Sequence, residues 1–170
     1  MKNIARTIEV IANVAIICVA ISLGVVLIGR TIRGYPVPAS ESANTAQVKN
    51  QKIQLPGVDW SKNEKTLVMA ISSTCHFCTE SAAFYRDIRA RTRVHTVAVL
   101  PQTVDEGRNY LSNLGVQVDE VLQAPPNSIG VSGTPTLMLV SRDGTVIHTW
   151  IGKLPPDLEK EVLLSVGAES

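Results

Sequence analysis

The sequence predicts an α/β domain with a central mixed β-sheet flanked by helices, preceded by one N-terminal transmembrane helix. Three observations predict this class. An apolar run without charges occupies residues 10–29, and strand and helix patterns alternate from residue 65 before ending in a hairpin and a helix. A C-x-x-C pair, Cys75 and Cys78, directly follows the first buried strand pattern.

The composition narrows the functional classes. The chain has 170 residues, of which 45% are hydrophobic, enough for one domain with a sizeable core and an appendage. Sixteen Lys and Arg against fifteen Asp and Glu give a net charge of +1, without the basic excess typical of nucleic-acid surfaces. We therefore expect no nucleic-acid partner.

The N-terminus is predicted to be a membrane anchor. Residues 10–29 contain no charge, and twenty helical residues span roughly 30 Å, the thickness of a hydrocarbon core. A cleaved signal peptide is the alternative, but its apolar region is usually about 7 to 15 residues, and the nearest small-residue site is near Ala39. Cys18 is interpreted as a small apolar side chain in this helix.

The orientation follows from the chemistry rather than from the charges. Lys2 and Arg6 precede the span and Arg30 and Arg33 follow it, so the positive-inside count nearly ties. A short tail, residues 1–9, is expected to stay in the cytoplasm. The C-terminal domain is then on the periplasmic side of an inner or plasma membrane, in a single-pass, signal-anchor arrangement.

A tether and one domain are predicted to follow the anchor. Residues 30–50 are rich in Pro and small polar residues, as is typical of a flexible linker, and the domain is expected at residues 51–170. Within it the patterns predict strands in KTLVMAI and VHTVAVLP, a helix over residues 76–90, and a second helix in TVDEGRNYLSNLG. On the first helix, Phe77, Phe84, Tyr85 and Ile88 are expected to share one face.

The C-terminal part predicts a short strand in VDEVLQA, a turn in PPNSIGV and then a β-hairpin. Asp143-Gly144 separates two apolar runs, which is a strong hairpin signal, and an amphipathic helix from Pro155 to Val166 closes the chain.

With TCHFC at residues 74–78 and GVSGTPTLMLVSRDGTVIHTWIG at residues 130–152, the sequence resembles membrane-anchored, extracytoplasmic thioredoxin-like thiol-disulfide oxidoreductases. The resemblance extends from Ile53 to the C-terminal helix and implies a thioredoxin fold. It also implies that Pro135 is a cis-proline opposite the cysteines, with Thr134 beside them. Two residues depart from the family pattern: Thr74 replaces a common tryptophan, and Met69 lies where thioredoxins carry a buried carboxylate.

Four interpretations of Cys75 and Cys78 can be compared. A c-type haem site needs C-x-x-C-H, and Thr79 occupies the histidine position. A structural zinc site needs four N or S ligands, for which the chain offers only scattered histidines. A static disulfide closing so short a loop would remove little chain entropy. Thiol-disulfide exchange fits best, because it needs a stabilised, partly exposed thiolate.

The helix start predicts how the two thiols divide the work. Cys75 lies at the N-terminus, where unpaired N–H groups and the helix dipole stabilise a thiolate, while Cys78 lies one turn inside and is expected to resolve the mixed disulfide. His76 is expected to tune the pKa of Cys75. A cis Pro135 would leave the Thr134 backbone free to bind an extended substrate.

The sequence therefore predicts an anchored oxidoreductase that exchanges disulfides with protein thiols through Cys75 and Cys78, with no cofactor and no metal. The alternative is a metal-binding or metal-delivering module that uses the same two thiolates with a histidine. A third possibility is a non-catalytic interaction domain with vestigial cysteines.

Overall fold

The computed structural model of the chain describes residues 50–167. The predicted tail, anchor and nearly all of the tether fall outside these residues, so those assignments stay predictions. Within residues 50–167, no helix is both long and apolar enough to cross a bilayer.

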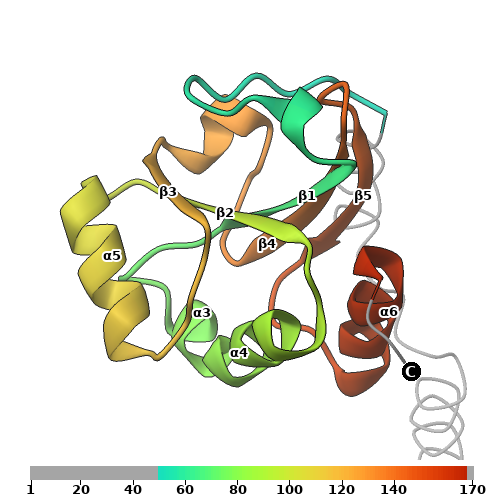
Figure 1. The fold of residues 1–170 in the computed structure, drawn as a ribbon. Coiled ribbons are helices and arrows are strands. Elements are labelled where there is room, and N and C mark those ends of the chain that lie inside the picture. Colours follow the sequence, from blue (N-terminus) through green and yellow to red (C-terminus); the bar gives the residue numbers. More distant parts are fainter. Residues whose placement is uncertain (1–49, 168–170) are drawn as a thin grey trace, which may run out of the picture. The chain divides into compact units, whose positions relative to one another are not determined.

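The described residues form a five-stranded mixed sheet with helices packed on it (Figure 1). The strand order is β3-β2-β1-β4-β5; β1, β2 and β3 are parallel, β4 is antiparallel to its neighbour β1, and β5 is antiparallel to β4. The elements in chain order are η1 (Trp60–Lys62), β1 (Lys65–Ala70), α3 (His76–Glu80), α4 (Ala82–Arg91), β2 (His95–Leu100), α5 (Val104–Asn113), β3 (Glu120–Gln123), η2 (Pro126–Ile129), β4 (Thr136–Ser141), β5 (Val146–Ile151) and α6 (Pro156–Val166).

Strand β1 lies at the centre of the sheet because its apolar side chains are buried on both faces. Leu67 and Met69 point to a core shared with the helices, and Val68 and Ala70 point to the opposite core. Figure 1 shows α3, α4 and α6 together on one side of the sheet. The other side is covered by the segment before β1 and the segment around η2, which contribute Ile53, Leu55, Ile129 and Val131.

The predicted first helix is interrupted. It divides at Ser81 into α3 and α4, and the Ser81 hydroxyl donates to the carbonyl of Phe77 at 2.8 Å. The change in direction places Phe84, Tyr85 and Ile88 in the core but leaves Phe77 55% exposed. The expectation that Phe77 shares their buried face was therefore wrong. A helical wheel assumes a continuous helix, and a break of one residue rotates the preceding turn off the apolar stripe.

Helix α5 begins as its sequence predicts. The Thr103 hydroxyl accepts from the Glu106 N–H at 3.4 Å, and the Glu106 carboxylate accepts from the Thr103 N–H at 3.0 Å. This reciprocal capping box satisfies two N–H groups that the helix itself leaves free.

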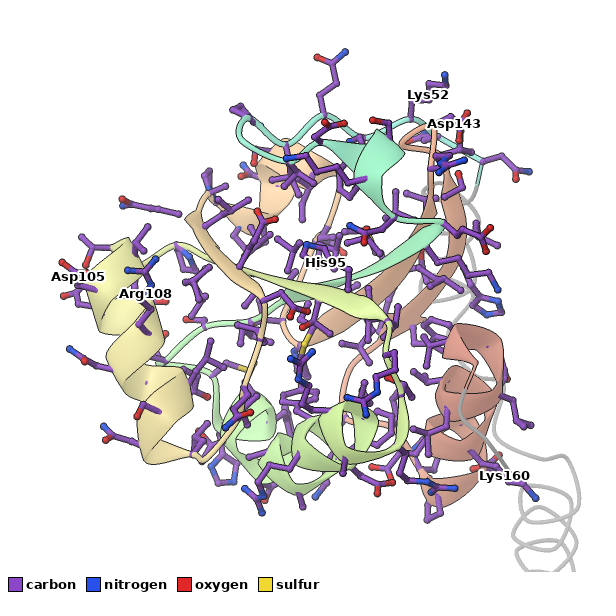
Figure 2. All side chains as sticks on the ribbon, viewed as in Figure 1. Lys52, His95, Asp105, Arg108, Asp143 and Lys160 are labelled. Atoms are coloured by element: carbon purple, nitrogen blue, oxygen red, sulfur yellow. The ribbon has the colours of Figure 1, made fainter. Side chains whose placement is uncertain are left out.

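The β4–β5 hairpin turns at Asp143-Gly144. Gly144 has φ +83°, and a Cβ added there would lie 3.0 Å from Cδ1 of Trp60, so both the backbone and the space require glycine. Asp143 pairs with Lys52 at 3.4 Å, and both side chains lie at the same corner of the domain (Figure 2). The turn thereby fastens the start of the described chain to β5.

Candidate active site

Cys75 is the N-cap residue of α3. Its backbone is extended, with φ −91° and ψ 113°, and its sulfur accepts a hydrogen bond from the Cys78 N–H at 3.3 Å. The Cys75 N–H in turn donates to the carbonyl of Ser72 at 3.2 Å. A sulfur in this position receives N–H groups that the first helical turn leaves unpaired, as the sequence predicted.

These contacts decide the ionisation of Cys75. Partial burial raises the pKa of its thiol, but hydrogen bonds from the Cys78 thiol, the Thr134 side chain and the N–H groups of Cys78 and Phe77 together outweigh it. The net result is a lowered pKa. Because the side chain is also partly exposed, Cys75 has both features that a nucleophilic thiolate needs.

Cys78 lies one turn later in the opposite environment. Its side chain is fully buried among apolar residues of the helical-side core, including Met69 and Tyr85. Burial, followed by its hydrogen bond to Cys75, raises the pKa of Cys78 to about 12. Both cysteines are free thiols in this structure. Two sulfurs in one helical turn therefore differ strongly in acidity and accessibility.

A loop distant in sequence completes the site. The Thr134–Pro135 peptide bond is cis, and the Cys75 thiol donates to the Thr134 carbonyl at 3.2 Å. Pro135 is buried, and its own carbonyl accepts from the Gly152 N–H at 2.7 Å. The structure thus brings together Cys75, Cys78, Thr134 and Pro135, which were selected from two separate motifs.

His76 is close in sequence but directs its ring elsewhere. Its Nε2 lies 3.1 Å from Oε1 of Glu80, and its side chain is 80% exposed. It is not among the groups that set the pKa of Cys75. The tuning role expected for His76 stays a prediction.

An ion pair at the end of α3 was missed by the sequence analysis. Glu80 accepts from Lys153 at 2.9 Å through Oε2 while its Oε1 meets His76. This connects α3 to the loop after β5. The i, i+4 spacing of His76 and Glu80 could have predicted their contact. Lys153 is 73 residues from Glu80, and no sequence pattern predicts that contact.

Comparison with known proteins was decisive for the family. Residues 60–166, well over half of the chain, match the family model described as "Thioredoxin-like domain". The chain belongs to the thioredoxin-like domain family. The match includes the C-x-x-C helix, the cis-proline loop and all five strands.

Solved structures share this thioredoxin-like fold. A Chlorobium tepidum protein, whose name places it among the thiol:disulfide interchange proteins (DsbE), superposes with a TM-score of 0.55 at 24% identity, covering 70% of this chain and 98% of that chain. A thiol-disulfide isomerase from Corynebacterium glutamicum superposes with a TM-score of 0.51 at 14% sequence identity, covering 72% of this chain and 95% of that chain. A thiol:disulfide interchange protein from Bacteroides sp. superposes with a TM-score of 0.50 at 18% sequence identity, covering 71% of this chain and 88% of that chain. At these identities the likeness shows the fold alone.

Both departures from the thioredoxin pattern are accommodated locally. Thr74, in the tryptophan position, places its hydroxyl 3.0 Å from that of Ser72. Met69, in the carboxylate position, is 2% exposed and packs in the core that contains Cys78.

A bound metal ion would need several ligating side chains grouped together. Within residues 50–167, no three His, Cys, Asp or Glu side chains are grouped so that they could hold a metal ion. His76, the histidine nearest the cysteines in sequence, pairs with Glu80 instead.

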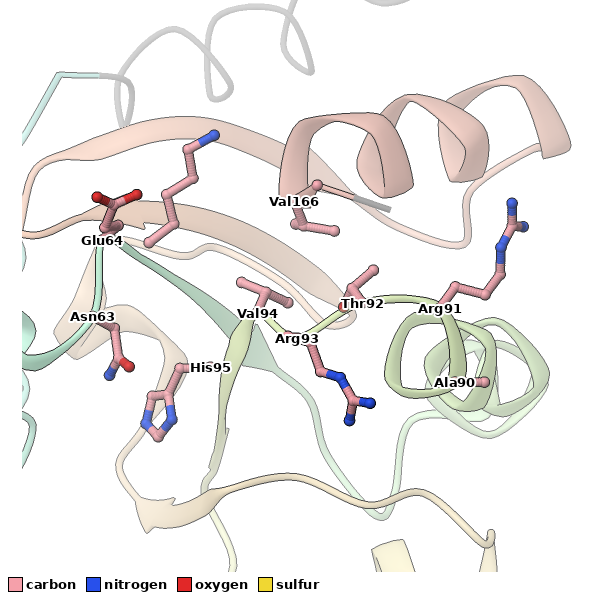
Figure 3. A pocket seen from close by; sticks show the side chains of 11 residues that line it. Asn63, Glu64, Ala90, Arg91, Thr92, Arg93, Val94, His95 and Val166 are labelled. Atoms are coloured by element: carbon pink, nitrogen blue, oxygen red, sulfur yellow. The ribbon is translucent and has the colours of Figure 1, made fainter. Parts of the chain in front are cut away.

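A cleft lies at the other end of the sheet (Figure 3). It has a volume of about 650 Å³ and is lined by Asn63, Glu64, Lys65, Ala90, Arg91, Thr92, Arg93, Val94, His95, Val166 and Gly167. Lys65 and His95 begin β1 and β2, whereas the cysteines follow the end of β1. The cleft is therefore separate from the candidate active site and contains none of the predicted site residues.

Proposed function

We propose that this chain is a protein thiol-disulfide oxidoreductase in which Cys75 attacks and Cys78 resolves. The observation that carries the proposal is the contrast between the two sulfurs. Cys75 is partly exposed and has a lowered pKa, while Cys78 is fully buried with a pKa raised to about 12. Exchange needs one thiolate that meets the substrate and a second thiol that is shielded until the first has reacted.

The reaction has two steps in the reductive direction. The Cys75 thiolate attacks one sulfur of a substrate disulfide; that S–S bond breaks, a mixed disulfide forms on Cys75, and the other substrate sulfur leaves as a thiolate. Cys78 then loses its proton to solvent and attacks the Cys75 sulfur. The intramolecular disulfide forms, and the second substrate thiolate departs and takes up a proton. Two electrons pass from the enzyme to the substrate.

The loop at Thr134 and Pro135 provides the docking edge. The Thr134 carbonyl lies 3.2 Å from the Cys75 sulfur, so a chain segment that pairs with the Thr134 backbone brings its own sulfur to Cys75. Pairing through the backbone selects extended protein segments with little dependence on their side chains. The substrates are accordingly protein thiols or disulfides, and sulfur-to-sulfur transfer requires no cofactor.

The domain works at a membrane surface in this proposal. The charge-free residues 10–29 have the length and composition of a spanning helix, and residues 30–50 have the composition of a tether. The domain at residues 51–170 is then on the periplasmic side, where thiols and disulfides of exported proteins are exchanged.

Insulin reduction by dithiothreitol tests the activity directly. The wild-type full-length chain should accelerate precipitation of the insulin B chain, and Cys75→Ser should abolish the acceleration. Cys18→Ser is the matched control, because it removes the third cysteine without altering the C-x-x-C pair, and it should keep the activity. The metal content of the wild type, purified reduced and without chelator, is measured alongside. Bound metal together with no insulin reduction would favour the metal-binding alternative.

A further inference from the structure

The loop after β5 is joined to α3 by an ion pair. Lys153, two residues past the end of β5, donates to Oε2 of Glu80, the last residue of α3, at 2.9 Å. The other oxygen of the same carboxylate, Oε1, lies 3.1 Å from Nε2 of His76. The pKa of Glu80 is lowered, mainly by the hydrogen bond from Lys153, so the carboxylate is charged at neutral pH. Because both of its oxygens have a partner, the carboxylate is held more firmly than in an isolated surface pair.

The loop after β5 also holds the docking edge. The Gly152 N–H donates to the Pro135 carbonyl at 2.7 Å. Thr136 and Ile151 are the last paired residues of β4 and β5 at this end of the sheet, so the bond from Gly152 lies just beyond the strand ladder. Hydrogen bonds at the end of a ladder open more readily than those inside it. How steadily the docking edge is held therefore depends on what else fixes the loop after β5.

Cys75 closes a ring of contacts around the site. Its thiol donates to the Thr134 carbonyl at 3.2 Å, and the same cysteine is the N-cap residue of α3. The contacts thus run from the end of α3 to the loop after β5, from that loop to the docking edge, and from the docking edge back to the start of α3. The nucleophile and the docking edge are therefore connected through both ends of this short helix.

Apolar packing and the ion pair hold the loop in different ways. Leu154, the residue after Lys153, is buried in the core cluster that also contains Cys78. This packing keeps the loop on the domain, but apolar attraction has no direction. The ion pair instead sets the distance between the loop and α3. An exposed ion pair adds little to the stability of a fold, so we expect the effect of this pair on the geometry of the site rather than on folding.

We propose that Glu80 and Lys153 are a positioning pair, which holds the docking edge beside the nucleophile for substrates that bind through their backbone. When the pair is broken, the loop after β5 moves more freely and the docking edge moves with it. A docked segment then brings its sulfur to Cys75 less often, and reaction depends on that placement. The inference rests on the proposed function, because it assigns a role in the docking of the same protein substrates.

Two disulfide substrates separate docking from the reactivity of the thiol. Insulin has a backbone that can pair with the docking edge, and its kcat/KM is measured with dithiothreitol as the reductant. Dithiobis(nitrobenzoate) has no peptide backbone. Attack by the Cys75 thiolate breaks its S–S bond, leaves one half on Cys75 and releases the other as coloured nitrothiobenzoate, and the rate of this first release is measured. The full-length chain carries Cys18→Ser, so that the remaining thiols are Cys75 and Cys78.

Lys153→Met is the test variant, since it keeps most of the side chain and removes the charge and the hydrogen bond. We expect kcat/KM for insulin to fall about two- to fivefold, the effect of an exposed ion pair, while the first release changes less than about twofold. The fall should come mainly from a higher KM, because docking is what is lost. Lys153→Arg keeps the charge and should keep the insulin rate. Arg91→Met is the matched control; Arg91 pairs with Asp87 on α4 at 3.2 Å with similar exposure, and its loss should change neither rate.

Glu80→Gln provides an independent arm, because it removes the charge from the other side of the pair. It should lower kcat/KM for insulin as Lys153→Met does, and the double variant should be no worse than the worse single variant. Equal slowing with both substrates, an unchanged insulin rate in Lys153→Met, or losses that add in the double variant would overturn the inference. A wild-type chain that does not reduce insulin would overturn the proposed function itself.

Discussion

The sulfur of Cys75 lies 3.2 Å from the carbonyl oxygen of Thr134, although 59 residues separate the two in the chain. The contact joins the end of β1 to the loop before β4, strands that pair antiparallel at the centre of the sheet. It places the reactive thiol against an edge of backbone that a substrate can pair with. The predictions below depend on this arrangement and on the contrast between the two thiols.

Removing each cysteine should give a different result. Cys78→Ser keeps the Cys75 nucleophile but cannot expel a bound partner, so covalent adducts through Cys75 should accumulate. Cys75→Ser should form none. Cells expressing each variant are quenched with acid and an alkylating agent, and higher-mass species that vanish on reduction are measured. Adducts with Cys75→Ser alone would reverse the assignment of the two thiols.

The pH dependence of alkylation should follow Cys75. Because its pKa is lowered, the iodoacetamide reaction rate of the reduced protein should reach half its maximum below the pH typical of a free thiol, about 8.5. Cys78→Ala removes the thiol that donates to the Cys75 thiolate, while the backbone N–H of residue 78 remains, and should move that midpoint upward. His76→Gln is the comparison; a rise in the midpoint as large as that of Cys78→Ala would support the tuning role predicted for His76, and an unchanged midpoint would contradict it.

Cys78 should make the stability of the reduced protein depend on alkaline pH. The pKa of Cys78 is raised from 9.0 to about 12 in the folded protein. The stabilisation of the folded state by the neutral, buried thiol is therefore fully present below pH 9 and is lost as pH rises toward 12. The difference in unfolding free energy between wild type and Cys78→Ala should therefore fall above pH 9, by up to about 1.4 kcal/mol per pH unit. Urea unfolding at pH 8, 9 and 10 measures the difference, which is expected to fall more between pH 9 and 10 than between pH 8 and 9. A difference that grows above pH 9 would contradict the burial of Cys78 as the cause.

Gly144→Ala should destabilise the domain more than Gly167→Ala. Both glycines have positive φ, +83° and +87°, so both variants incur backbone strain of about 1–2 kcal/mol. Only at Gly144 would the new Cβ meet Trp60, at 3.0 Å, and overpacking adds about 1 kcal/mol or more. Thermal unfolding of the two variants decides this, and equal melting temperatures would show that Trp60 moves away without cost.

The full-length chain should fractionate with membranes and resist extraction by alkaline carbonate. The reason is the charge-free run at residues 10–29, which is long enough to span the hydrocarbon core. Protease added to intact spheroplasts should digest the C-terminal domain if it lies outside. Recovery of the chain mainly as a soluble species cut near Ala39 would indicate a cleaved signal peptide.

The sequence alone determined the order of strands and helices, because each depends on local patterns. The apolar run of β1, the helix in TVDEGRNYLSNLG and the Asp143-Gly144 turn depend on patterns within a few residues, and each forms where it was predicted. Placing Cys75 at a helix start followed in the same way. The pairing of Pro135 with the cysteines came from resemblance to a family rather than from any local pattern.

Only the tertiary structure decided which side chains meet. The break at Ser81 turns Phe77 to solvent, the His76 ring faces Glu80 rather than Cys75, and Gln102 reaches Ser72 from the end of a neighbouring strand. Such contacts depend on strand register and helix direction, which join residues tens of positions apart, and no periodicity in one segment encodes a partner in another. The burial of Cys78 in the core that contains Met69 likewise arises from packing on β1. This burial is the main reason why the pKa of Cys78 is raised while that of Cys75 is lowered.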